Sequence, residues 1–105
     1  MIKMAFERLK KKITKENLWL YILTLLKNGP VYGYELKDKI KEKFGFEPAK
    51  ITTYVVLYKL EKEGLVKSIK NTEKSSRKYY YITEKGSKTL EEGLKFLKKM
   101  INSLE

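Results

Sequence analysis

The chain of 105 residues contains no cysteine and no histidine. Without cysteine there are no disulfides and no thiolate nucleophiles, and without histidine the sequence lacks the commonest metal ligand and general base. No apolar run approaches the ~18 residues of a membrane span, and charges interrupt the first twelve residues where a signal peptide needs an apolar segment. We therefore expect a cytoplasmic protein with no membrane contact, no metal, no cofactor and no catalytic residue.

Acidic residues are also scarce, with 13 Asp and Glu against 24 Lys and Arg and a net charge of +11. The excess is even along the chain, because residues 1–50 carry 12 cations against 6 acids and residues 51–105 carry 12 against 7. Such an excess favours a polyanionic partner, above all nucleic acid. A Lys- and Glu-rich solubilising surface is the alternative, but a surface of that kind normally carries similar numbers of positive and negative charges.

The N-terminal half predicts three helices. Residues 1–13 form an amphipathic segment whose apolar stripe could pack on the body, on a second subunit or on an anionic membrane. Thr14 offers an N-cap for a second helix at 15–27, which Asn28, Gly29 and Pro30 end. A third helix is expected at 33–44, with Gly45 as its stop.

The stretch 49–64 predicts a two-faced helix. At 100° per residue Thr53, Leu57 and Leu60 fall on one side, and an opposite face holds Thr52, Val55, Lys59 and Lys62. Two strands follow at 65–69 and 78–83, joined by a basic hairpin tip at 70–77. Helix, turn, helix and hairpin in this order predict an α+β, mostly helical fold, the winged helix-turn-helix, whose second helix enters a DNA groove.

The last segment predicts a long helix with Thr83 as its N-cap. Its apolar residues recur at heptad spacing, which favours pairing with the same helix of another copy. We expect the homodimer interface to contain Leu90, Leu94, Leu97, Ile101 and Leu104. The chain thus divides into an N-terminal helix at 1–13, a DNA-binding domain at 14–83 and a dimerisation helix at 84–105.

Four motifs carry a resemblance to a known family: GPVYGYEL at 29–36, FGFEP at 44–48, TTYVVLYKLEKEGLV at 52–66 and RKYYYITEKG at 77–86. In this order and spacing they resemble the PadR family of winged-helix transcriptional regulators, in its form with a short C-terminal helix. The resemblance implies a homodimeric repressor in which Tyr54, Arg77 and Lys78 touch the DNA backbone. By the helical wheel alone, Tyr54 lies near the core boundary, so a structural role is equally open.

The resulting hypothesis is a dimer that places helix 49–63 of each copy in successive major grooves of a near-palindromic operator, with the hairpin tip on the backbone. The residues expected to face bases are Thr52, Val55 and Lys59. Those expected to hold phosphates are Lys50, Tyr54, Lys62, Lys74, Ser75, Ser76, Arg77 and Lys78.

Two other readings stay open. A winged-helix module could instead bind protein or single-stranded nucleic acid within a larger transcription or replication complex. An unknown small-molecule effector could also bind between dimer halves, against Trp19, Phe96 and Met100, although an aromatic and Met stripe is also typical of plain core packing. No nucleophile and base stand out in a pattern that would indicate an enzyme.

Overall fold

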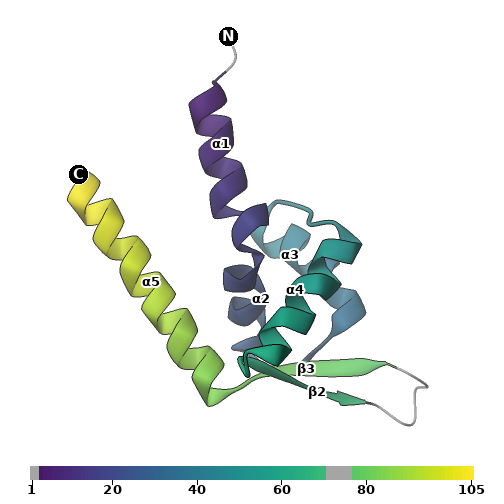
Figure 1. Ribbon diagram of the computed structural model, residues 1–105. Coiled ribbons are helices and arrows are strands. Elements are labelled where there is room, and N and C mark those ends of the chain that lie inside the picture. Colours follow the sequence, from purple (N-terminus) through teal and green to yellow (C-terminus); the bar gives the residue numbers. More distant parts are fainter. Residues whose placement is uncertain (1–2, 71–76) are drawn as a thin grey trace.

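The computed structural model describes residues 3–70 and 77–105. Within these residues, five α-helices and three strands follow one another (Figure 1). The helices are α1 (Met4–Ile13), α2 (Leu18–Leu26), α3 (Leu36–Phe44), α4 (Lys50–Lys62) and α5 (Glu84–Leu104). The strands are β1 (Val31–Tyr32), β2 (Val66–Lys70) and β3 (Lys78–Ile82), and short 3₁₀ turns, η1 (Lys15–Asn17) and η2 (Gly33–Glu35), precede α2 and α3.

The core lies where α2, α3 and α4 meet, and β2, β3 and the first turns of α5 close it. Apolar side chains at helical spacing, such as Leu18, Ile22 and Leu26 on α2, present one face to this centre. The expected inner face of α4 is confirmed, because Thr53, Leu57 and Leu60 are buried. The largest fully buried side chains include Ile22, Leu23, Leu26, Leu36, Ile40, Leu57 and Val66.

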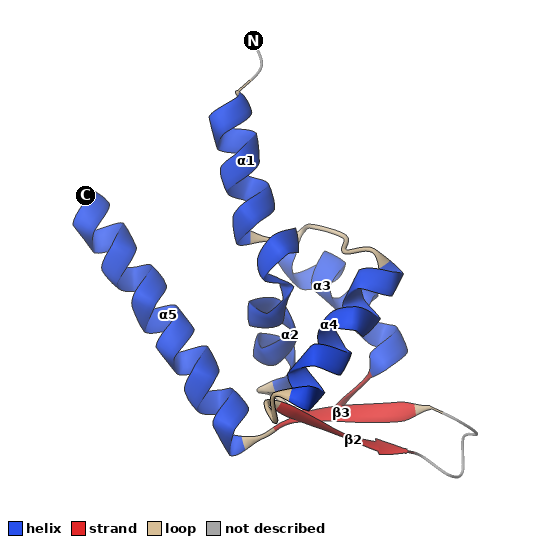
Figure 2. Cartoon of the chain, viewed as in Figure 1, coloured by secondary structure: helices blue, strands red, loops and turns tan. Residues whose placement is uncertain are grey.

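The strands form an antiparallel sheet in the order β1-β3-β2, drawn in red in Figure 2. In the hairpin Val66 lies opposite Ile82 and Lys70 lies opposite Lys78. β1 pairs with the other edge of β3, and the sequence did not predict it, since a strand of two residues shows no alternation. The fold class is confirmed: an α+β, mostly helical winged helix-turn-helix.

Two expectations about single residues are wrong. Thr14 does not cap the second helix; its hydroxyl donates to the Lys10 carbonyl at 2.6 Å and closes α1, and α2 begins only at Leu18 after η1. Leu90 is not free for a dimer interface, because it is buried in the core of its own chain. The heptad residues of α5 therefore lie partly in the core, at Leu90, and partly on the exposed surface, at Leu94, Ile101 and Leu104. That residues 84–105 form a separate dimerisation unit stays a prediction.

A tight joint connects the end of α4 to the start of α5. Thr83 caps α5 as expected, accepting from the Gly86 amide at 3.0 Å, and its hydroxyl also donates to the Gly64 carbonyl at 2.6 Å. The Thr83 amide donates to the Leu65 carbonyl at 3.0 Å. Gly64 takes φ +78°, a left-handed conformation that suits glycine. A side chain at Gly86 would overlap the Leu65 carbonyl oxygen.

We predict that Gly86→Ala lowers the free energy of unfolding by about 1–3 kcal/mol, the usual cost of overpacking. Alanine is the better helix former by about 1 kcal/mol, so a loss of stability would run against helix propensity. Urea unfolding followed by circular dichroism measures it. Ser87→Ala, at the exposed neighbouring position, is the control and should change stability by less than about 0.5 kcal/mol. Equal behaviour of the two variants would contradict the close approach.

Candidate nucleic-acid interface

The outward face of α4 is a stripe with spacings of four, three and four residues. It consists of Ile51, Val55, Tyr58 and Lys62, and the first three are 78%, 45% and 61% exposed. Lys62 lies over the Tyr58 ring, with its ammonium 5.4 Å from the ring centroid. Val55 and Lys62 were expected on this face, but Ile51 and Tyr58 were missed. Their spacing could have revealed them, because residues three and four apart share one side of a helix.

The two flanks of α4 face different parts of the chain. On one flank, Thr52 and Lys59 each line a shallow cleft shared with Lys15 of η1. On the other flank, Lys50 and Tyr54 line a cleft shared with Tyr34 of η2. The structure thus brings Lys50 and Tyr54 together and separates them from Lys59. Of the expected base-facing residues, Val55 lies on the outward face and Thr52 and Lys59 lie at its margin.

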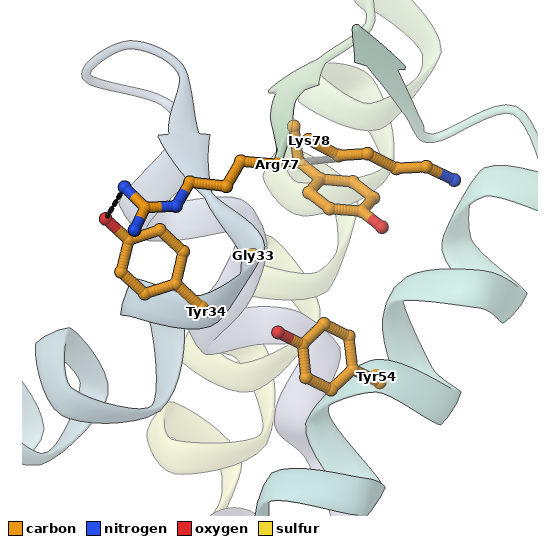
Figure 3. Close-up of a pocket in the computed structure, with 6 residues that line it drawn as sticks. Gly33, Tyr34, Tyr54, Arg77 and Lys78 are labelled. Carbon is orange, nitrogen blue, oxygen red and sulfur yellow. Dashed lines mark hydrogen bonds between the residues drawn. The ribbon is translucent and has the colours of Figure 1, made fainter. Parts of the chain in front are cut away.

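Tyr54 also lines a second cleft, of about 380 Å³, between η2, the start of α4 and the start of β3 (Figure 3). Its described lining residues are Gly33, Tyr34, Tyr54, Arg77, Lys78 and Tyr80. The Arg77 guanidinium lies 4.9 Å from the centroid of the Tyr34 ring, and its Nη1 donates to the Tyr34 hydroxyl at 3.4 Å. We call this cleft the Tyr34–Arg77 cleft.

Glycine is required at the back of the Tyr34–Arg77 cleft. A Cβ at Gly33 would lie 2.9 Å from the Tyr80 ring and 3.4 Å from the Tyr54 ring. No sequence pattern singled out Tyr34, because it precedes a helix and does not belong to a periodic stripe. Of the expected phosphate ligands, Arg77, Lys78 and Tyr54 come together here, whereas Lys74, Ser75 and Ser76 lie outside the described residues.

A chain of aromatic contacts supports this cleft. The Tyr79 and Tyr32 rings stack with centroids 3.9 Å apart, and the Tyr32 and Tyr34 centroids are 5.4 Å apart. A hydrogen bond with Tyr32, then burial, raises the pKa of Tyr79. Burial, followed by the charge of Glu61, raises the pKa of Tyr80. Both hydroxyls therefore stay protonated at neutral pH and can donate hydrogen bonds.

The ion pairs of the described residues do not include Lys50, Lys62, Arg77 or Lys78. The Glu47 carboxylate forms ion pairs with Lys37 at 3.2 Å and with Lys41 at 3.3 Å. Hydrogen bonds from these two ammonium groups lower the pKa of the Glu47 carboxyl. Other pairs lie within α1, η1 and α5: Lys10–Glu7, Lys12–Glu16, Lys88–Glu84 and Lys95–Glu91. Within residues 3–70 and 77–105, no carboxylate lies within 4 Å of the side-chain nitrogens of Lys50, Lys62, Arg77 or Lys78.

The residues expected to hold an effector do not share a cleft in one chain. Trp19 packs against Gly93, where a Cβ would lie 2.9 Å from its ring, and it lines a cleft of about 390 Å³ with Val56, Leu60 and Leu65. Phe96 and Met100 lie exposed farther along α5. An effector site formed by these three residues stays a prediction that needs a second copy of the chain.

Two features are absent from residues 3–70 and 77–105. No helix there has both the length and the apolar character that crossing a membrane demands. No group of three or more acidic side chains, the ligand types available to this sequence, comes together there in a way that could hold a metal ion.

A helix-turn-helix followed by a hairpin, with a solvent-exposed second helix and unpaired cations beside it, defines the winged-helix class of transcription regulators. Within this class the chain belongs to the transcriptional regulator PadR-like family, whose model matches residues 22–92. The family confirms that the protein is a transcription regulator and not an enzyme. No curated protein matches the sequence.

Solved structures agree with this assignment. A transcriptional regulator from Clostridium thermocellum is 35% identical, with a TM-score of 0.71 over 82% of this chain and 90% of its own. A PadR family regulator from Eggerthella lenta is 26% identical, with a TM-score of 0.77 over 96% and 93%. Bacillus subtilis PadR, solved in complex with operator DNA, is 32% identical with a TM-score of 0.64; the match covers 73% of this chain and 45% of that one.

Proposed function

We propose that the protein is a sequence-specific regulator that binds double-stranded DNA as a homodimer on a near-palindromic operator. The outward face of α4 enters the major groove, where Val55 and Thr52 contact base edges and Lys59 reaches them from the margin. Lys50, Tyr54, Lys62, Arg77 and Lys78 hold phosphates and set the register of the protein on the duplex. Occupation of a promoter then represses transcription.

The observation that carries this proposal is the grouping of unpaired cations around the exposed face of α4. Among residues 3–70 and 77–105, no carboxylate lies within the 4 Å of an ion pair from Lys50, Lys62, Arg77 or Lys78, so these four cations keep their charge for a partner. The net charge of +11 adds a long-range attraction for a polyanion. The similarity to Bacillus subtilis PadR, which was solved with operator DNA, supports the same partner for this chain.

The exposed stripes of α1 and α5 support the dimer. α1 buries none of its residues, and its apolar side chains, among them Phe6 and Leu9, face solvent. On α5, Ile101 and Leu104 are 54% and 87% exposed. Both helices project from the body toward the same side (Figure 1). Exposed apolar surface of this kind marks an interaction site, and a twofold dimer buries it on both copies at once.

The dimer interface therefore consists of Leu94, Leu97, Ile101 and Leu104 on α5, without Leu90, together with the apolar side of α1. Because α1 does not pack on its own body, we assign its stripe to the partner subunit. In the dimer the two copies of α4 lie about 34 Å apart, one turn of the duplex.

We predict that selection from a random DNA pool recovers duplexes with two related half-sites about 10 base pairs apart. Affinity for the selected duplex should fall ~10³- to 10⁵-fold between 50 and 200 mM salt, as expected when 6–10 phosphates are neutralised. Fluorescence anisotropy measures this fall. A flat salt response, or equal affinity for single strands, would favour the rival interaction module that binds protein or single-stranded nucleic acid.

We predict that Lys50→Ala weakens binding to all duplexes alike and lowers the salt slope by about 0.9 for each bound chain. Lys59→Ala should reduce affinity less, because Lys59 lies on the other flank of α4 beside Lys15. Salt titrations of both variants, which remove the same charge from the same helix, make the comparison. A larger loss for Lys59→Ala, confined to one base pair of the selected site, would instead make Lys59 the principal base contact.

We predict that Ile101→Glu shifts the protein from dimer to monomer in sedimentation experiments, because a carboxylate buried in an apolar interface has no partner. Lys99→Glu is the matched control, since it places the same group on the opposite side of α5 and should leave the dimer intact. A monomeric wild-type protein, or equal dissociation of the two variants, would exclude the proposed interface.

A further inference from the structure

Ile51 is the most exposed of the three uncharged residues in the outward stripe of α4. Its side chain is 78% exposed, and Val55 and Tyr58 continue the stripe at 45% and 61%. The opposite face of the same helix is packed into the core. One chain alone therefore leaves this apolar surface uncovered, and surface of this kind marks a contact with a partner.

The charges around the stripe indicate which partner covers it. Lys50 precedes Ile51, and Lys62 ends the stripe two turns beyond Val55. Within residues 3–70 and 77–105, α4 takes part in no ion pair, whereas the lysines of α1 and α5 pair with glutamates of their own helices. A DNA duplex suits such a surface, because it offers phosphates to the cations and an apolar group, the methyl of thymine, inside the major groove.

The isoleucine side chain selects among bases by what it lacks. It has no donor or acceptor, so against guanine or adenine it covers hydrogen-bonding groups without replacing the water that they lose. The C5-methyl group of thymine is the apolar group that base edges present in this groove. We propose that Ile51 is a specificity-determining residue of α4 and contacts the C5-methyl group of one thymine in each half-site.

The position of Ile51 in the helix fits this contact. It is the second residue of α4, and the N-terminal residues of a recognition helix are those that reach base edges. Val55 lies one helical turn further on the same side, so it extends the apolar contact toward a neighbouring base pair. This inference rests on the proposed DNA-binding function and adds to it the base that one residue reads.

The test uses the full chain and the selected duplex, with one thymine at a time replaced by uracil, which lacks only the C5-methyl group. For the wild type we expect a position in each half-site where this change lowers affinity about fourfold, the factor for burying one methyl group. Ile51→Ala should abolish the response at that position. Ile51→Val, which keeps a branched apolar side chain, should retain most of it. Fluorescence anisotropy measures each affinity.

Ile69→Ala is the matched control, because it makes the same substitution at a residue that is 57% exposed on β2. Whatever its overall affinity, it should respond to every uracil duplex as the wild type does. Since Ile51 is exposed, Ile51→Ala should keep the melting temperature of the wild type.

A second arm returns the methyl group on another base. A cytosine–guanine pair at the responsive position should bind less tightly, and 5-methylcytosine should recover about fourfold in the wild type but nothing in Ile51→Ala. If no uracil duplex weakens binding, or if Ile51→Ala keeps the full response or an equal recovery, the assignment of Ile51 is wrong while the DNA-binding function stands. If the wild type binds no duplex at all, both fail.

Discussion

The rest of the structure depends on the joint between the turn after α4 and the first turn of α5. There the Thr83 hydroxyl donates to the Gly64 carbonyl and accepts from the Gly86 amide, and Lys85 donates to the Glu63 carbonyl at 2.8 Å. The hydrogen bonds engage backbone groups at two helix ends that would otherwise lack partners. They also set the angle between α4 and α5. In a dimer this angle determines the separation of the two DNA-contacting surfaces.

The charged residues fall into two groups, exposed ion pairs and cations that contact aromatic rings. The ion pairs on α1, α5 and around Glu47 are exposed, and such pairs contribute only about 0–1 kcal/mol to stability. The cations beside α4 are organised instead by aromatic rings: Lys62 by Tyr58 and Arg77 by Tyr34. A ring orders a cation while leaving its full charge for a partner.

Local signals predicted much of the fold. The inner face of α4 and the cap at Thr83 follow from spacing and from one hydroxyl, so the sequence sufficed for them. Thr14 has a hydroxyl that could also cap a helix, but this hydroxyl donates to the Lys10 carbonyl in the preceding helix. The residue type alone does not distinguish these two hydrogen bonds. Leu90 has the spacing of the α5 stripe, yet it packs in the core of its own chain because the joint places the first turns of α5 there. The partnership of Tyr34 with Arg77, 43 positions apart, depends on tertiary pairing and leaves no local pattern.

The outward face of α4 limits how this protein can read DNA. Ile51 and Val55 offer no hydrogen bonds, so against base edges they distinguish little beyond the methyl group of thymine. Tyr58 adds one hydroxyl, but its ring is engaged with Lys62. In the proposed complex, phosphate contacts supply affinity but carry no sequence information directly. In the proposed dimer, discrimination then comes largely from the separation of the two copies and from DNA that bends to meet both. The joint at Thr83 would constrain that separation.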